Sequence, residues 1–328
     1  MNSKLLRIMA LRILSSIFVL FLVISLVFVI IHLAPGNPSQ KYLSPNLSQK
    51  LYEEVSESYN LNSSLFNQYL AFVKNVINGD LGISYNYRQP VISVIKSYLS
   101  FTIIFGFISF FLQMIVAFIL VYLTFIFKSE KFEKYLVNIN LTIYSIPIFI
   151  SSILLIYIFS FKLNILPSSG LKSFDFYNLN SFQKVADYTQ HLILPFIASS
   201  FAAIPIYYKY FYGSIKNIVN ANFVKNLEMI GLNKNKILFS NIIPNSLNTL
   251  IAVAGVELGL LLGGSVLVET IFGLPGMGRL TMMAVVSRDY PLIIATVLFA
   301  SLIVLVINLV SDIIRTIIDK RLLKSLLS

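Results

Sequence analysis

The chain is 328 residues long, with 57% hydrophobic residues, 12% charged residues and a formal net charge of +11. Soluble domains carry about 25% charged residues, so the composition excludes an ordinary soluble domain and indicates a membrane protein. The absence of cysteine excludes disulfide bonds, thiolate metal sites and thiol nucleophiles. The basic residues lie in short segments beside apolar runs, where they set membrane orientation, and this placement argues against nucleic-acid binding.

Six apolar stretches are long enough to cross a bilayer. A spanning helix needs about 20 apolar residues, because the hydrocarbon core is about 30 Å thick and a helix rises about 1.5 Å per residue. Backbone amides cannot stay unpaired in lipid, so each stretch is expected to be helical. The sequence therefore predicts an all-α membrane protein with six transmembrane helices, at residues 13–33, 101–127, 135–161, 191–212, 247–271 and 290–314.

The first stretch resembles the start of a signal peptide, because Lys4, Arg7 and Arg12 precede it. It is too long for the core of a signal peptide, and no small-residue cleavage site precedes Pro35. We therefore expect residues 1–33 to be a retained N-terminal anchor helix.

The distribution of lysine and arginine predicts the orientation. Basic residues gather at the N-terminus, in residues 128–134, in residues 209–247 and in the tail 315–328. With six spans these regions lie on one side, and the positive-inside rule makes that side the cytoplasm. We therefore expect a multi-pass protein of the cytoplasmic membrane, with both termini cytoplasmic and a core of five transmembrane helices at 101–314.

Residues 34–100 form a loop too long for a simple connector, on the side opposite to the basic regions. The loop begins with the turn cluster Ala34-Pro35-Gly36-Asn37-Pro38, which ends the first helix. Apolar spacing predicts short helices at 48–59 and 64–77, with Asn78-Gly79 as a helix stop. We expect a small extracytoplasmic cap, which either meets a partner or ligand outside the cell or only covers the bundle.

Residues that carry catalytic chemistry are scarce. The chain has no Gly-x-x-x-x-Gly-Lys-Ser/Thr phosphate loop and no His-Glu-x-x-His motif. Its two histidines, His32 and His191, lie near span ends and are expected to be interfacial polar residues rather than metal ligands. Nothing resembles a nucleophile with its base, so we predict a non-catalytic chain without a metal or cofactor of its own.

The fifth predicted span carries a stripe of small residues. Gly255, Gly259 and Gly263 recur every four residues, so they lie on one side of the helix. Small residues let helix backbones approach closely in lipid. The stripe is explained either by ordinary packing within the chain or by a seam between two subunits.

The same span carries two acids, Glu257 and Glu269. An acid inside a membrane is costly and usually faces a bundle interior or an aqueous path. Glu257 lies about 200° around the helix from Gly255, so it faces away from the glycine stripe. Glu269 lies near the outer end of this span, on the same side of the helix as the glycine stripe. For Glu257 we expect a role in a translocation path or in locking helices together, with a satisfied interhelical hydrogen bond as the alternative.

Two prolines interrupt predicted spans. Pro147 and Pro205 each remove a helix hydrogen bond and favour a kink in the third and fourth spans. Kinked spans suit a gate that rocks, but they also occur in rigid bundles.

Residues 213–247 form a polar, basic, helix-compatible segment between two apolar stretches. Residues 222–232 resemble the cytoplasmic coupling motif of binding-protein-dependent ABC importer permeases, which reads Glu-Ala-Ala, three residues, Gly, nine residues and an Ile-x-Leu-Pro-like end. Gly231 matches the glycine, and Asn241 to Pro244 occupy the end. The Glu-Ala-Ala triplet is not kept, since Lys225, Asn226 and Leu227 stand in its place.

Further motifs in the order found in the peptide/nickel permease family extend this resemblance along nearly the whole chain. They are Leu33-Ala34-Pro35-Gly36-Asn37-Pro38, Gly79-Asp80-Leu81-Gly82-Ile83-Ser84, Ser145-Ile146-Pro147, Leu166-Pro167-Ser168-Ser169-Gly170, His191-Leu192-Ile193-Leu194-Pro195, Glu269-Thr270-Ile271-Phe272-Gly273-Leu274-Pro275-Gly276-Met277-Gly278-Arg279, Arg288-Asp289-Tyr290-Pro291 and Asn308 to Asp312. Lys320 departs from the proline that usually precedes the terminal arginine.

The resemblance implies a type I ABC importer permease fold with an extracytoplasmic cap after the first helix. It implies four kinds of partner: a second homologous permease subunit, two cytoplasmic ATP-binding subunits, an extracellular substrate-binding protein and the lipid bilayer. ATP hydrolysis is then expected on the partner chains. The implied residues of ATPase coupling are Lys225, Asn226, Leu227, Glu228, Gly231 and Pro244.

In this interpretation the fifth span lies at the translocation path or the subunit seam, with Gly255, Glu257, Gly259, Gly263 and Glu269. The cargo remains open between peptides and nickel or its chelates. A membrane-bound enzyme and a receptor or assembly scaffold without transport activity are the alternatives from other functional classes.

Overall fold

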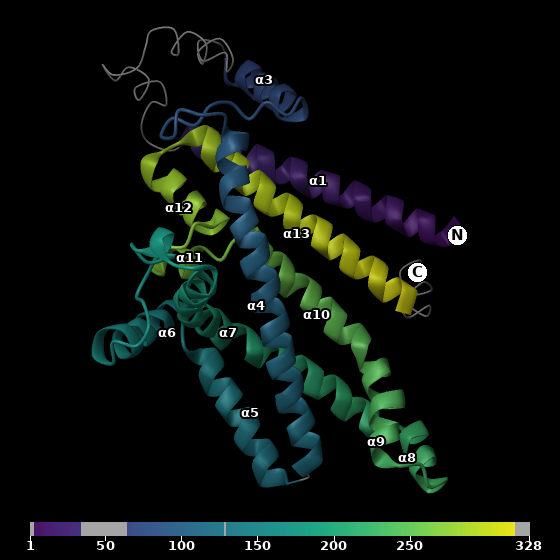
Figure 1. Ribbon diagram of the computed structural model, residues 1–328. Helices are drawn as coiled ribbons and strands as arrows, with labels where there is room; N and C mark the ends of the chain where they lie inside the picture. Colours follow the sequence, from purple (N-terminus) through teal and green to yellow (C-terminus); the bar gives the residue numbers. More distant parts are fainter. Residues whose placement is uncertain (1–2, 34–63, 128, 319–328) are drawn as a thin grey trace.

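The computed structural model describes residues 3–33, 64–127 and 129–318, and these residues fold into a helical bundle (Figure 1). Its α-helices are α1 Ser3–Leu33, α3 Leu65–Ile77, α4 Val91–Phe127, α5 Glu130–Ser145, α6 Ile148–Leu155, α7 Ser181–Val219, α8 Asn222–Met229, α9 Lys234–Ile237, α10 Ile243–Gly263, α11 Val266–Ile271, α12 Met277–Ser287 and α13 Tyr290–Ile318. Two π-helical segments, Ile156–Lys162 and Leu238–Ile242, and one 3₁₀ turn, Phe176–Asn178, complete the helical elements of the described residues.

All six predicted stretches are helical, but they do not all form single straight spans. Among the described residues, four helical stretches are long and apolar enough to cross a membrane, and the number rises to six if each of two bent pairs counts as one span. The four are Ala10–Ile30, Val91–Phe127, Asn235–Ile271 and Tyr290–Ile318.

The third predicted span bends sharply where a kink was expected. The axes of Glu130–Ser145 and Ile148–Lys162 differ by 92°. Ile146 is extended (φ −82°, ψ 117°), as a residue before proline prefers, and Pro147 (φ −57°, ψ 137°) is the N-cap residue of α6. A single helix across 135–161 is therefore wrong, because the two residues at the break leave the helical conformation altogether.

The fourth predicted span also bends. Its two parts, Ser181–Phe201 and Ala203–Val219, are inclined by 46°. Pro205 lies just after the bend, and because it has no N–H it cannot donate to the carbonyl of residue 201. The bend predicted from Pro205 is confirmed.

The glycine stripe packs against α13 of the same chain. A Cβ added to Gly259 would lie 3.5 Å from Val304 Cα, and one on Gly263 would lie 3.4 Å from Val304 Cγ2. A Cβ on Gly255 would collide with Ser311, whose hydroxyl donates to the Ile251 carbonyl at 2.9 Å. Packing within the chain thus accounts for the stripe without a subunit seam.

The N-terminal helix runs beside α13 (Figure 1) and is tied to it by an ion pair between Arg12 Nη1 and Asp312 Oδ2 at 2.9 Å. Near the other end of α1, Phe28 stacks on Phe72 of α3, and Ser25 and Tyr69 share a hydrogen bond of 2.6 Å. The short helix α3 is therefore packed on the end of α1.

The predicted helix at 64–77 is confirmed. Ser64 caps α3, accepting a hydrogen bond from the Asn67 amide, and Asn78 with Gly79 ends it at a positive φ of 78°. The helix predicted at 48–59 lies outside the described residues.

Candidate coupling segment and translocation cavity

The predicted coupling segment lies at one end of the bundle, opposite to α11 and α12 (Figure 1). It consists of α8, the turn at Gly231 and α9. Val224 of α8 is buried, and it packs with Phe211 and Ile237 in an apolar cluster that Leu227 borders. The inner side of α8 therefore rests on the core of the bundle.

The outer side of α8 is open. Lys225, Asn226 and Glu228 are exposed, and their side chains have no hydrogen bond or ion pair within the described part of the chain. Met229 and Ile230 are 76% and 73% exposed, although both are apolar. The end of α8 therefore presents a small exposed apolar surface beside exposed polar residues.

Gly231 lies just after the end of α8 and is in the left-handed region, at φ 81°. Its amide donates to the Glu228 carbonyl at 3.0 Å, and the Leu232 amide donates to the Leu227 carbonyl at 3.2 Å. A Cβ at this position would have no atom within 4 Å. Glycine is therefore needed here for its backbone conformation and not for space.

Pro244 is the second residue of α10 and is exposed. Helix α10 continues directly from the π-helical segment Leu238–Ile242, since the Ile243 amide donates to the Leu238 carbonyl. Pro244 has no N–H and donates no hydrogen bond of its own. It thus lies where the coupling segment leads into the bundle.

Sequence reasoning missed a cluster that ties α5 to α7 near the coupling segment. Lys216 Nζ lies 2.7 Å from Glu133 Oε1 and 2.9 Å from the Tyr212 hydroxyl, which itself donates to Glu133 Oε1. Glu133 lies 79 positions from Tyr212 and 83 positions from Lys216, so helical spacing could not reveal this contact.

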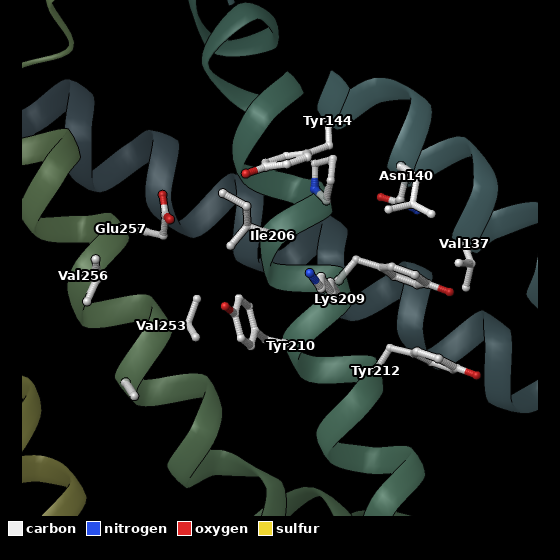
Figure 2. A pocket seen from close by; sticks show the side chains of 14 residues that line it. Val137, Asn140, Tyr144, Ile206, Lys209, Tyr210, Tyr212, Val253, Val256 and Glu257 are labelled. Carbon is white, nitrogen blue, oxygen red and sulfur yellow. The ribbon is translucent and has the colours of Figure 1, made fainter. Parts of the chain in front are cut away.

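A cavity of about 690 Å³ lies between α5, α7 and α10 (Figure 2). Its wall is mostly apolar and aromatic, with two charged side chains, Lys209 and Glu257. The lining residues are Val137, Asn140, Leu141, Tyr144, Pro205, Ile206, Tyr208, Lys209, Tyr210, Tyr212, Ala252, Val253, Val256 and Glu257. A volume of this size is in the range of small-molecule sites, about 300–1,000 Å³.

Glu257 lines this cavity, while Gly255 on the same helix faces α13. The predicted separation of the acid from the glycine stripe is confirmed. The Glu257 carboxylate is partly exposed and has no hydrogen bond or ion pair with any described residue. The alternative of a satisfied interhelical hydrogen bond is therefore wrong within that part of the chain. Beneath it, the buried hydroxyl of Tyr207 also lacks a hydrogen-bond partner among the described residues.

Glu269 does not share a helix with Glu257, because Gly264 (φ 115°) ends α10 and α11 starts at Val266. Glu269 is 0% exposed. Its carboxylate accepts from the Arg279 amide at 3.0 Å and from the Thr102 hydroxyl at 3.1 Å, and Thr102 accepts from the Met277 amide at 2.7 Å. Glu269 therefore caps the N-terminus of α12 and does not line the cavity.

The glycines around Glu269 leave room for this cap. A Cβ on Gly276 would collide with the Glu269 carboxylate, and one on Gly278 would lie 2.6 Å from the Val266 amide nitrogen. The motif that begins at Glu269 and ends at Arg279 is thus a single packed unit. Gly276 and Gly278 leave the space that the Glu269 carboxylate and the Val266 backbone occupy.

Two other motifs also meet each other. Asp289 is buried, caps α13 through the Leu292 amide at 3.3 Å, and accepts from the Ser84 hydroxyl at 2.5 Å and from the Asn86 amide at 3.0 Å. Burial and the nearby Asp289 charge raise the pKa of the Tyr85 phenol. The segment before α4 is thereby fastened to the start of α13.

The segment that joins α6 to α7 contacts the same region. The Gly170 amide donates to the Phe272 carbonyl at 2.8 Å, and Arg279 donates to the Gly273 carbonyl. In the loop-to-helix segment nearby, Asp187 accepts from the Ser173 amide at 3.0 Å, and the His191 Nδ1 lies 3.6 Å from the Asp187 carboxylate. Within the described residues, no three histidines or acids are grouped as metal ligands.

Comparisons with known proteins agree with this arrangement. The family model described as binding-protein-dependent transport system inner membrane component matches residues 113–324, and the model of the N-terminal part of such membrane components matches residues 5–106. The chain is similar to the oligopeptide transport system permease protein AppB of Bacillus subtilis, at 30% identity over 95% of this chain and 97% of AppB. It is also similar to the glutathione transport system permease protein GsiC of Escherichia coli, at 29% identity over 94% of this chain and 96% of GsiC.

The fold has a counterpart among solved structures. A chain of the inward-facing MetNI methionine ABC transporter superposes with a TM-score of 0.55 at 16% identity, covering 70% of this chain and 98% of that chain. The two family models together span most of the sequence, from the first helix to the tail. The chain therefore belongs to the family of binding-protein-dependent transport system inner membrane components.

Proposed function

We propose that the chain is a transmembrane permease subunit of an ATP-binding cassette importer, which forms half of a translocation path and couples it to ATPase subunits. The observation that carries the proposal is the coupling segment. It rests on the core through Val224 and Leu227 and presents exposed apolar side chains at its tip. A membrane-bound enzyme or a receptor scaffold has no need for such a unit.

Coupling follows from this arrangement. Met229 and Ile230 would enter a groove of a cytoplasmic ATP-binding subunit, with Lys225, Asn226 and Glu228 around them. Closure of two such subunits on ATP would displace α8, and the apolar contacts of Val224 would pass the movement to the bundle. Nucleotide and cargo would then bias the same two-state equilibrium of the permease.

The cavity between α5, α7 and α10 is the proposed half of the path, and a second homologous permease subunit would complete it. Glu257 supports this role because it lies in the cavity wall without a partner among the described residues. The stripe of Gly255, Gly259 and Gly263 and the acid Glu269 are left out of the path, since each has a packing contact inside the chain.

The proposed cargo is a short peptide delivered by an extracellular substrate-binding protein. The relatives are named as permeases for oligopeptides and for glutathione, which is itself a small peptide. Neither name mentions nickel, so the peptide alternative is preferred to the metal. The basic regions favour a location in the cytoplasmic membrane with both termini and α8 on the cytoplasmic side.

An uptake experiment tests the function. A strain lacking this chain should lose uptake of radiolabelled trialanine, and the intact chain should restore it. Ile230→Glu should lower uptake at least tenfold and release the ATP-binding subunits from the purified complex, because a charge would replace an apolar contact.

The matched control is Ile77→Glu at the end of α3, since Ile77 is 78% exposed and Ile230 is 73% exposed. This variant should retain the ATP-binding subunits. Normal uptake and normal retention of those subunits in Ile230→Glu would contradict the coupling role.

A further inference from the structure

We infer that the cavity is selective for a zwitterionic cargo, whose ammonium group pairs with Glu257 and whose carboxylate pairs with Lys209. This inference rests on the proposed function and adds the chemistry by which the permease itself recognises its cargo. It concerns only the cavity wall and is independent of selection by a binding protein.

The two charges face one space from different helices. Glu257 belongs to α10 and Lys209 to α7, and both line the cavity between these helices (Figure 2). No ion pair joins them to each other or to any other described residue. Each charge is therefore available to a molecule in the cavity.

The two charges also lie at different depths. Ser214 of α7 lies beside Ser246 of α10, because its hydroxyl is 3.5 Å from the Ser246 carbonyl oxygen. From that level Lys209 is five residues along α7, or about 7.5 Å, and Glu257 is eleven residues along α10, or about 16.5 Å. The acid thus lies deeper than the base, and a cargo with one charge at each end would lie along the cavity.

The rest of the wall suits a peptide better than a bare ion. Tyr144 and Tyr210 are exposed in the cavity and have no hydrogen bond to a described residue, so their phenols can bind amide groups. Val253 and Val256 supply apolar surface for side chains. A metal ion would need several oxygen or nitrogen ligands, and Glu257 is the only carboxylate in the lining.

Unpaired charges in such a wall are costly until a partner arrives. A charged group in a mostly apolar cavity loses hydration and regains free energy when an opposite charge binds. A cargo lacking one of its two charges would leave Glu257 or Lys209 unpaired. Blocking either end of a peptide should therefore weaken binding in the cavity, and each block should depend on one residue only.

The absence of cysteine from the chain allows a direct test. Val256→Cys would place one thiol in the cavity wall of the complete, nucleotide-free importer. Its rate of reaction with N-ethylmaleimide is measured on this subunit while trialanine, N-acetyl-trialanine or trialanine amide is added. The control is Val285→Cys on α12, because Val285 is 51% exposed and Val256 is 50% exposed.

Trialanine should protect the cysteine at position 256 from reaction, and each blocked peptide should need an at least tenfold higher concentration to give the same protection. Tenfold corresponds to about 1.4 kcal/mol. Adding Glu257→Gln should remove the preference for a free amino end only, and adding Lys209→Gln should remove the preference for a free carboxyl end only. The cysteine at position 285 should not be protected.

Equal protection by all three peptides, or protection by none, would overturn the inference. So would a Glu257→Gln change that weakens all three equally, because it would show that Glu257 supports the cavity without contacting the cargo. Neither result touches the proposed function, which is tested separately by the dependence of trialanine uptake on this chain and by Ile230→Glu.

Discussion

Replacement of Glu269 by glutamine distinguishes a helix cap from a path residue. The carboxylate accepts from the Arg279 amide and the Thr102 hydroxyl, and the Thr102 hydroxyl itself accepts from the Met277 amide. Glutamine keeps the shape but turns one of the two acceptors into a donor. If the amide group turns toward Thr102, the hydroxyl can rotate and accept, whereas the Arg279 amide can only donate.

The loss is then one charge-assisted hydrogen bond and the negative charge at the N-terminus of α12. Hydrogen bonds to charged groups contribute about 1.5–3 kcal/mol each. The helix dipole adds about 0.3–1 kcal/mol. We therefore expect local opening at the start of α12 to become easier by about 2–4 kcal/mol, and the exchange of the amides at 277–279 to speed up by about 30-fold to 1,000-fold.

The assay is hydrogen exchange followed by mass spectrometry on the assembled importer. Glu257→Gln is the control, because Glu257 lines the cavity between α5, α7 and α10, and this change should leave exchange at 277–279 unchanged. Unchanged exchange in Glu269→Gln, together with altered cargo selectivity, would refute the cap and restore the path role expected from the sequence.

Two further predictions concern glycines. Gly231→Ala should cost about 1 kcal/mol of local stability and reduce uptake, because alanine disfavours the backbone conformation at φ 81°. Gly213→Ala inside α7 should be neutral or stabilising, since a Cβ there also meets no atom within 4 Å. Thermal unfolding and uptake measure both variants, and equal effects would contradict the reasoning. Gly255→Ala should destabilise the protein by about 1–3 kcal/mol, because the new Cβ would collide with Ser311, and Ser311→Gly should restore the stability of this variant. Gly259→Ala should be tolerated, because its Cβ would lie 3.5 Å from Val304. Thermal unfolding measures all three variants, and failure of the rescue would show that the contact with Ser311 is not the cause.

Local patterns predicted the helices well. Apolar runs marked every long helix, and Ser64 with Asn78-Gly79 marked both ends of α3. Pro147 marked a break, but its 92° angle depends on what α6 packs against, which the sequence around one proline does not contain. The angle is a tertiary property, so only the structure reports it.

Of the candidate site residues, some were predicted correctly from the sequence and others were not. The side of the helix on which Glu257 lies follows from helical geometry over the two residues from Gly255, so this prediction was correct. Glu269 was placed on the same helix because Gly264 was read as part of an apolar run, and its partner Thr102 is 167 positions away. The tie between Ser84 and Asp289 spans 205 positions and was equally invisible, although both residues belong to motifs that the sequence had marked.

The cap on α12 has a mechanical consequence. At that end of the molecule, directional hydrogen bonds among buried groups hold α4, α11 and α12 in one arrangement. At the other end, α8 rests on apolar contacts, which have no preferred direction and allow small sliding movements. We therefore expect α12 to keep its place in the bundle and α8 to shift more easily. A displacement of α8 should rotate the helices about the end that holds Glu269, so that the cavity wall moves further than that end does.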